Sequence, residues 1–169
     1  MSDTLIRDQG ASLAKSNPEK AIAKARSIKE PWFRAQALAY VARFSQTKGI
    51  ELAAEAASTA RKCDDAYKRV AVRACEIAAL AEGRNTRHAR KSLASALKDS
   101  LAIESFPSRA EALMLLLQAA VLVGPKERDH VHAALKEACV TDTHWRSKRA
   151  LRDAESICNG SQKARPFFW

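Results

Sequence analysis

The feature that most constrains the fold is a short pattern that occurs four times along the chain. In its fullest copy, Trp32, Phe33 and Arg34 precede an alanine-rich apolar run. The later copies are centred on Arg69, Arg109 and Arg146, at offsets of 35, 40 and 37 residues. Periods of roughly 34 to 47 residues are typical of repeats built from two helices. The chain is therefore predicted to be a helical repeat protein.

The rest of the sequence fits an all-α fold. Hydrophobic residues make up 47% of the chain, many of them alanine, and there are only five Gly and five Pro. Alanine favours helices and lets them approach closely. Apolar residues at helical spacing, with Asn, Ser, Asp, Pro and Gly at the ends, predict about nine helices. They span 3–16, 19–28, 32–46, 51–63, 66–82, 86–102, 108–123, 126–140 and 144–158.

These helices group into one leading helix and four pairs. A single pair cannot bury its apolar stripe alone, so neighbouring pairs are expected to stack into one continuous core, as in an α-solenoid. We expect one repeat domain over residues 1–160 and a separate tail over 161–169 that ends in aromatic residues.

The segment from Arg34 to Val41 resembles the first helix of a tetratricopeptide repeat, with Ala37 and Val41 at its small and large packing positions. Leu38 stands where that family has a glycine, and the spacing departs from a strict 34 residues, so HEAT-like stacking is the alternative. The resemblance covers residues 17–158. It implies a right-handed, curved α-solenoid with a binding role and names no ligand.

The repeated arginine has two interpretations. The four arginines either form a row that contacts a carboxylate or phosphate ligand, or each pairs locally and sets how the repeats stack. A cation is unfavourable at a helix N-terminus and needs a compensating partner. We therefore favour a local partner near the preceding turn, which gives this residue an architectural role.

Other basic residues are candidates for binding a ligand or partner. The formal net charge is +10, which favours acidic partners. Phosphate-backbone contact is one function for these residues, an acidic protein is another, and a solvated basic face is the structural alternative. The candidates lie on the second copy, on the run that follows it, and on the fourth copy: Arg69, Arg73, Arg84, Arg87, Arg90, Lys91, Arg146, Arg149 and Arg152.

The tail offers a different kind of contact. Phe167, Phe168 and Trp169 follow a polar linker, and three aromatic side chains left in water would form a sticky patch. We expect the tail either to fold back over the last helix pair or to dock into another copy of the chain. The second arrangement would give a homodimer.

Catalytic and metal sites are not predicted. His130 and His132 are two residues apart, which places them on nearly opposite sides of a helix, and no closely spaced Cys/His set occurs. No glycine-rich phosphate loop occurs either, so we expect no enzyme activity and no cofactor. Some HEAT-like proteins are DNA glycosylases, but the analogy rests on fold alone.

The compartment is predicted from similarly indirect signals. The four cysteines form no CxxC pair and are expected to be reduced thiols, mostly in the core. The polar N-terminal residues do not resemble a signal peptide, and the apolar run 112–123 is too short to cross a bilayer. We therefore expect a cytoplasmic protein with no membrane partner. Its expected function is to bind a protein or peptide on its curved face, with nucleic-acid binding through a basic face as the alternative.

Overall fold

The computed structural model describes residues 2–45 and 47–167. The described residues form helices, turns and loops and contain no strand, which confirms the all-α prediction. The helices are α1 (Asp3–Leu13), α2 (Pro18–Ser27), α3 (Pro31–Ala42), α4 (Gly49–Ala60), α5 (Ala66–Ala71), α6 (Arg73–Glu82), α7 (Thr86–Ser100), α8 (Phe106–Val123), α9 (Pro125–Cys139) and α10 (Trp145–Cys158).

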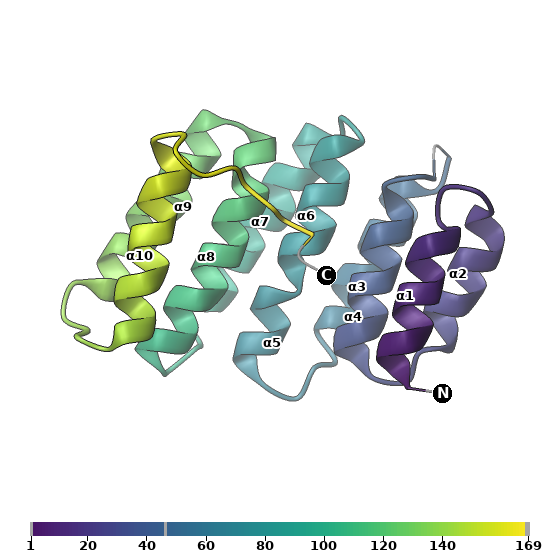
Figure 1. Cartoon of the computed structure of the whole chain (residues 1–169), viewed down its shortest axis with the longest axis horizontal. Coiled ribbons are helices and arrows are strands. Elements are labelled where there is room, and N and C mark those ends of the chain that lie inside the picture. Colours follow the sequence, from purple (N-terminus) through teal and green to yellow (C-terminus); the bar gives the residue numbers. More distant parts are fainter. Residues whose placement is uncertain (1, 46, 168–169) are drawn as a thin grey trace.

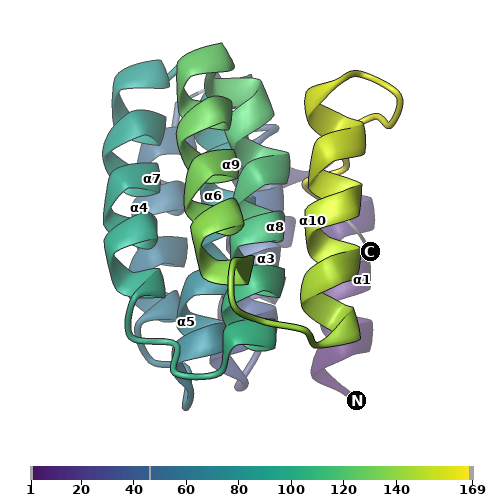
Figure 2. The same cartoon turned by 90° about the vertical axis from the view of Figure 1, so that its left-hand side faces the viewer.

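The helices lie in two layers (Figure 1). The front layer contains α1, α3, the α5–α6 pair, α8 and α10, and α2, α4, α7 and α9 lie behind it. Along the front layer, α1 packs against α3, α3 against α6, α6 against α8 and α8 against α10. In the side view, α1 and α10 stand forward of α3 and α8 (Figure 2). We call the outer side of this layer the front face.

Capping residues explain where most helices begin. Asn17 accepts a hydrogen bond from the backbone N–H of Lys20 at 3.1 Å, and Pro18 takes the first helical position. Ser105 caps α8 in the same way. Thr141, Asp142 and Thr143 are the residue types expected to cap the next helix, but the cap of α10 is His144, whose Nδ1 accepts from the N–H of Arg146.

The helix predicted over 66–82 is interrupted at Val72, between α5 and α6. There the N–H of Cys75 bonds to the carbonyl of Val72, three residues back, which tightens the turn. Beside this interruption, Arg73 is only 5% exposed and forms an ion pair with the buried Glu76. Sequence periodicity gave no sign of this break.

The buried side of α1 also differs from prediction. Apolar spacing predicts that Leu5, Ile6, Leu13 and Ala14 are buried. Ala14 is buried as predicted, but the Leu5 side chain is 47% exposed, and Arg7 and Gly10 are buried as well. Arg7 is buried because its guanidinium donates to the side-chain oxygen of Gln36 on α3, at 3.0 Å. A buried arginine is rare without such a partner, and the apolar pattern could not reveal one.

The longest helix, α8, lies at the centre of its half of the molecule. It packs against α6, α7, α9 and α10. Its 18 residues reach the length and hydropathy of a membrane span, which the shorter run 112–123 did not suggest. Half of this window is buried inside the protein, and core helices commonly meet the same criteria, so this is weak evidence for a span.

Candidate functional site

A cleft of about 460 Å³ opens on the front face between α3, α5, α8 and α10. We call it the front-face cleft. Residues from four helices and from the tail line it, although they are far apart in sequence. They are Trp32, Tyr67, Glu111, Met114, Leu115, Gln118, Arg149, Ala150, Asp153 and Gln162.

One wall of the cleft is aromatic. Trp32 begins α3 and Tyr67 begins α5, and their rings stack with centroids 6.4 Å apart and planes at 22°. Each of these aromatic residues lies two residues before a repeated arginine, Arg34 or Arg69, and so belongs to the repeated pattern. Burial raises the pKa of the Tyr67 hydroxyl, and the nearby Glu111 carboxylate raises it further. Tyr67 is therefore a neutral hydrogen-bonding group at this wall.

The repeated arginine has the expected local partner in three copies. In each, the guanidinium donates to the backbone carbonyl six residues earlier. Arg34 bonds to Ile28 at 2.6 Å, and Arg69 bonds to Cys63 at 3.0 Å. Arg109 bonds to Ile103 at 2.7 Å. These arginines therefore fix the loop that joins two successive helices, which is an architectural role.

The fourth copy is different. Val140 lies six residues before Arg146 and is 79% exposed, whereas Ile28, Cys63 and Ile103 are buried. Arg146 turns instead to Glu111 on α8 and donates to both carboxylate oxygens, and its Nε lies 2.9 Å from Oε1. Arg149 adds a third hydrogen bond to Glu111 at 3.1 Å. In this copy two arginines therefore bond to one acid, and Arg149 and Glu111 of this group line the front-face cleft.

The charges at the cleft depend on one another. The hydrogen bond from Arg146 holds the pKa of Glu111 below its usual value, and Arg149 acts in the same direction. Glu111 in turn raises the pKa of Arg146. Arg149 stays about half exposed and lies 5.0 Å from the Trp145 ring. The exposed part of Arg149 can therefore meet a ligand at the rim while one terminal guanidinium nitrogen is bonded to Glu111.

The floor and the far side complete the cleft. Met114, Leu115 and Ala150 provide apolar surface, and Gln118 provides an amide. That amide oxygen accepts a hydrogen bond from the backbone N–H of Arg165 in the tail, at 2.6 Å. Gln118 thus already binds a peptide backbone here. Neither Glu111 nor Gln118 had been singled out from the sequence, where each is one polar residue in a long apolar helix.

Arg69 and Arg73 do not lie at this cleft. With Arg61 and Asp99, they line a separate hollow of about 300 Å³. Arg73 is buried and pairs with Glu76 at 2.8 Å and with Asp99 at 3.6 Å. Arg69 is engaged with the Cys63 carbonyl. Both arginines are therefore engaged within the protein, Arg69 through one carbonyl and Arg73 through its two acidic partners.

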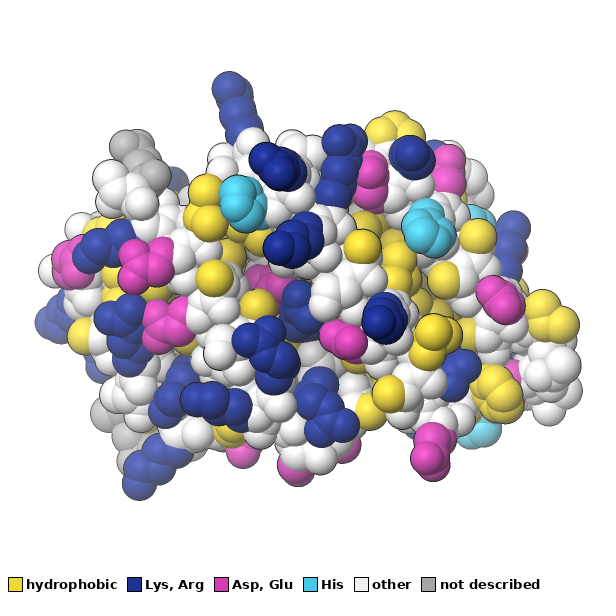
Figure 3. All heavy atoms as spheres, turned by 180° about the vertical axis from the view of Figure 1, so that it is seen from behind, with side chains coloured by type: hydrophobic (Ala, Val, Ile, Leu, Met, Phe, Trp, Pro, Cys, Tyr) yellow, Lys and Arg dark blue, Asp and Glu magenta, His cyan; other side chains and the backbone are white. Residues whose placement is uncertain are grey.

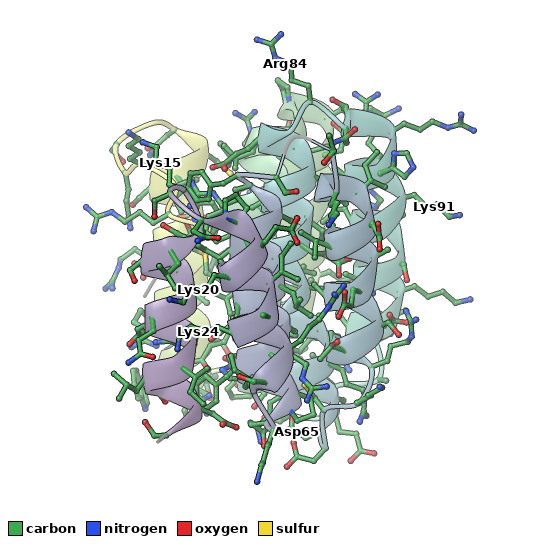
Figure 4. All side chains as sticks on the ribbon, turned by 90° about the vertical axis from the view of Figure 1, so that its right-hand side faces the viewer. Lys15, Lys20, Lys24, Asp65, Arg84 and Lys91 are labelled. Atoms are coloured by element: carbon green, nitrogen blue, oxygen red, sulfur yellow. The ribbon has the colours of Figure 1, made fainter. Side chains whose placement is uncertain are left out.

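The basic run 84–91 lies elsewhere again, at the end of α6 and on α7 in the back layer. Figure 3 shows that Lys and Arg are numerous on the back of the molecule, with Asp and Glu among them. Arg84 and Lys91 extend away from the body (Figure 4). Arg90 pairs with Glu127 at 2.8 Å. Arg87 is exposed on the same helix as Lys91. Arg87, Arg90 and Lys91 lie on α7, Arg84 lies in the turn before it, and none of the four lines the front-face cleft.

The remaining candidates lie on α10 and in the tail. Arg152 is exposed and 3.4 Å from Asp153. Phe167 packs against Tyr40 of α3, so the tail crosses the front face instead of stopping at the last helix pair (Figure 1). Phe168 and Trp169 lie outside the described residues.

The described residues contain no group of three or more His, Cys, Asp or Glu side chains placed to hold a metal ion. All four cysteines are free thiols, and three of them are buried.

The fold and the cleft define an all-helical protein with an aromatic, partly charged groove across one layer. Comparisons of the chain with protein-family profiles, with curated proteins and with solved structures found no match.

Proposed function

We propose that this chain is a non-enzymatic helical-repeat scaffold that binds a protein or peptide segment in the front-face cleft. The supporting observation is the composition of that cleft. A stacked aromatic wall, an apolar floor and an arginine–glutamate group lie together in about 460 Å³. Aromatic residues and arginine are enriched among the residues that contribute most to protein binding, especially in desolvated pockets. An extended segment would meet all of these groups in turn.

The proposed architecture is a right-handed α-solenoid of about four helix pairs after an N-terminal helix, of the tetratricopeptide or HEAT kind. The order of contacts along the front layer and the second layer behind it support this proposal. The curved front layer suits a segment laid along it. We further propose a cytoplasmic location, which the four free thiols support.

Peptide selection tests the proposal. A displayed random-peptide library is enriched on the full chain, and the affinity of the enriched peptides is measured by fluorescence anisotropy. In a Tyr67→Leu, Arg149→Ala variant, affinity is expected to fall by at least about 10-fold, because the stacking ring and the rim cation are lost. Lys91→Ala on the back layer is the matched control and should bind as the wild type does. Equal binding by both variants would refute the assignment of the cleft.

The alternative function is nucleic-acid binding through the back layer. One observation favours it: Arg84, Arg87 and Lys91 are exposed, and no ion pair joins them to an acid in residues 2–45 and 47–167. A labelled 20-base-pair duplex, titrated at 50 and 200 mM salt, tests this alternative. Counterion release predicts a steep fall in affinity with salt and weaker binding by an Arg87→Ala, Lys91→Ala variant. No binding at 50 mM salt would eliminate this function.

A further inference from the structure

The tail after α10 is directed back across the front face. Gly160 adopts a φ of +80°, a conformation that suits glycine, and the N–H of Gln162 bonds to the carbonyl of Ser156 at 2.9 Å. Beyond this turn the chain is extended and crosses the front layer toward α3 (Figure 1). Gln162 lines the front-face cleft, and Arg165 bonds to Gln118 on the cleft wall.

Phe167 inserts into a group of side chains at the C-terminal end of α3 and just after it. It meets Tyr40 edge to face, with centroids 5.7 Å apart, and the Arg43 guanidinium lies 4.0 Å from the Phe167 ring centre. Arg43 also lies over Tyr40 and Phe44, at 4.9 and 5.4 Å. We call Tyr40, Arg43 and Phe44 the aromatic receptor. It binds the flat face and the edge of one aromatic ring, in geometries that favour aromatic pairs and cation–π contacts.

The aromatic receptor is held by groups other than the tail. Arg43 makes two hydrogen bonds to Glu82 of α6, at 2.6 and 3.0 Å. Tyr40 and Phe44 contact each other and pack against the core of the N-terminal half. Gln118 likewise belongs to α8. Because these contacts are made between groups outside the tail, we expect the groove to stay formed when the tail leaves and rebinding to require little rearrangement.

The tail itself is suited to dissociate and rebind. Residues 161–167 form no helix or strand, and Lys163 and Arg165 are exposed. Pro166 has a fixed φ and biases Arg165 toward an extended conformation, which lowers the entropy lost when the segment binds. The bound tail thus has the features of a short linear ligand. The backbone N–H of Arg165 donates to the groove, Pro166 follows, and the aromatic ring of Phe167 comes next.

We propose that residues 162–167 are a built-in competitor, and that the partner of this surface is an extended segment of the same chemistry, with an aromatic residue directly after proline. The inference rests on the proposed function and specifies its ligand. Gln118 is shared, since it lines the front-face cleft and binds the tail. A partner that lies along the cleft and reaches the aromatic receptor must therefore displace the tail.

The test uses a fluorescein-labelled peptide with the sequence of residues 160–169. It is titrated against the wild-type chain and against a full-length variant in which Gly and Ser replace residues 164–169. A short flexible linker gives a tethered segment a millimolar effective concentration. The wild type is therefore expected to bind the peptide at least about 10-fold more weakly than the tail-replaced variant. Tyr40→Leu in the tail-replaced chain should weaken binding, and Lys91→Ala should not.

Several outcomes would overturn the inference. Equal affinity of the wild type and the tail-replaced variant would do so, as would no binding to either. Undiminished binding of a Phe167→Ser peptide would show that the aromatic receptor is not the site. A dimer on light scattering that the tail replacement converts to monomer would show that a second copy binds the tail. If the tail-replaced chain does not fold, the exchange rate of the Arg165 amide hydrogen is compared in the wild type and in Gln118→Ala. The inference requires faster exchange in the variant, and equal rates would overturn it.

These outcomes separate the inference from the proposed function. If the library peptides bind at the front-face cleft but the tail peptide does not, the inference fails and the function stands. If neither class of peptide binds, both fail.

Discussion

The bond from Arg109 to the loop after α7 gives the sharpest stability prediction. Its guanidinium donates to the Ile103 carbonyl at 2.9 and 2.7 Å and to the Leu101 carbonyl at 3.2 Å. In Arg109→Gln the shorter side chain cannot reach these carbonyls, and both lose a charged donor near the C-terminal end of α7. Hydrogen bonds to charged groups contribute roughly 1.5–3 kcal/mol when buried. Because Arg109 is partly exposed, we expect a loss of about 2 kcal/mol.

Thermal and urea unfolding followed by helical circular dichroism measure this loss. For a chain of this size, about 2 kcal/mol corresponds to a fall in Tm of roughly 4–8 °C. Arg87→Gln is the matched control, since that residue is exposed on α7, and its effect is expected to stay within about 0.5 kcal/mol. The architectural role of the repeated arginine is refuted if the two variants lose equal stability.

Three further changes test other parts of the structure. Gly10→Ala should raise the free energy of unfolding, measured in urea, by about 0.5–1 kcal/mol. Gly10 lies within α1, and an added Cβ would lie at an ordinary contact distance of 3.8 Å from its nearest neighbours. A less stable variant would contradict this packing. Glu76→Ala removes the main acidic partner of the buried Arg73 and should lower the free energy of unfolding by about 3 kcal/mol. The double variant Arg73→Met, Glu76→Leu leaves no unpaired charge and should have a stability closer to that of the wild type. A double variant as unstable as Glu76→Ala would contradict this explanation. The folded-state pKa of Glu111 lies below its ordinary 4.5, so its stabilisation is complete above that pH and is lost as pH falls through the lowered value. Glu111→Gln should therefore lower Tm at pH 7, by an amount corresponding to at most about 1 kcal/mol, and should have a smaller effect at pH 3 than at pH 7. An equal effect at both pH values would refute this linkage.

The helix ends could be predicted because their causes are local. Asn17 with Pro18, and Gly124 with Pro125, mark where one helix stops and the next begins, and the structure places ends within a residue or two of them. The interruption at Val72 could not be predicted, since a buried ion pair lies beside it and the α5–α6 pair contacts four other helices, α3, α4, α7 and α8. The same holds for Arg7, whose burial depends on Gln36, 29 residues away.

The site was less accessible to sequence reasoning. Arg149, one of the predicted binding residues and not part of the repeated pattern, does line the front-face cleft. However, the aromatic wall is built from Trp32 and Tyr67, which belong to the repeated pattern. A repeated residue can pack between helices with one side and line a binding surface with the other, provided that its neighbours leave that second side exposed. Only tertiary packing decides which side that is.

The central claim is that the front-face cleft binds a peptide segment, and the methionines allow a direct measurement. The chain has two, Met1 and Met114, and Met114 lines the cleft. In a full chain labelled at its methionine methyl groups, a selected peptide is expected to shift the Met114 signal in proportion to binding, while a nucleic-acid duplex leaves it in place. A bound peptide that leaves the Met114 signal unmoved, or a duplex that shifts it, would contradict the claim.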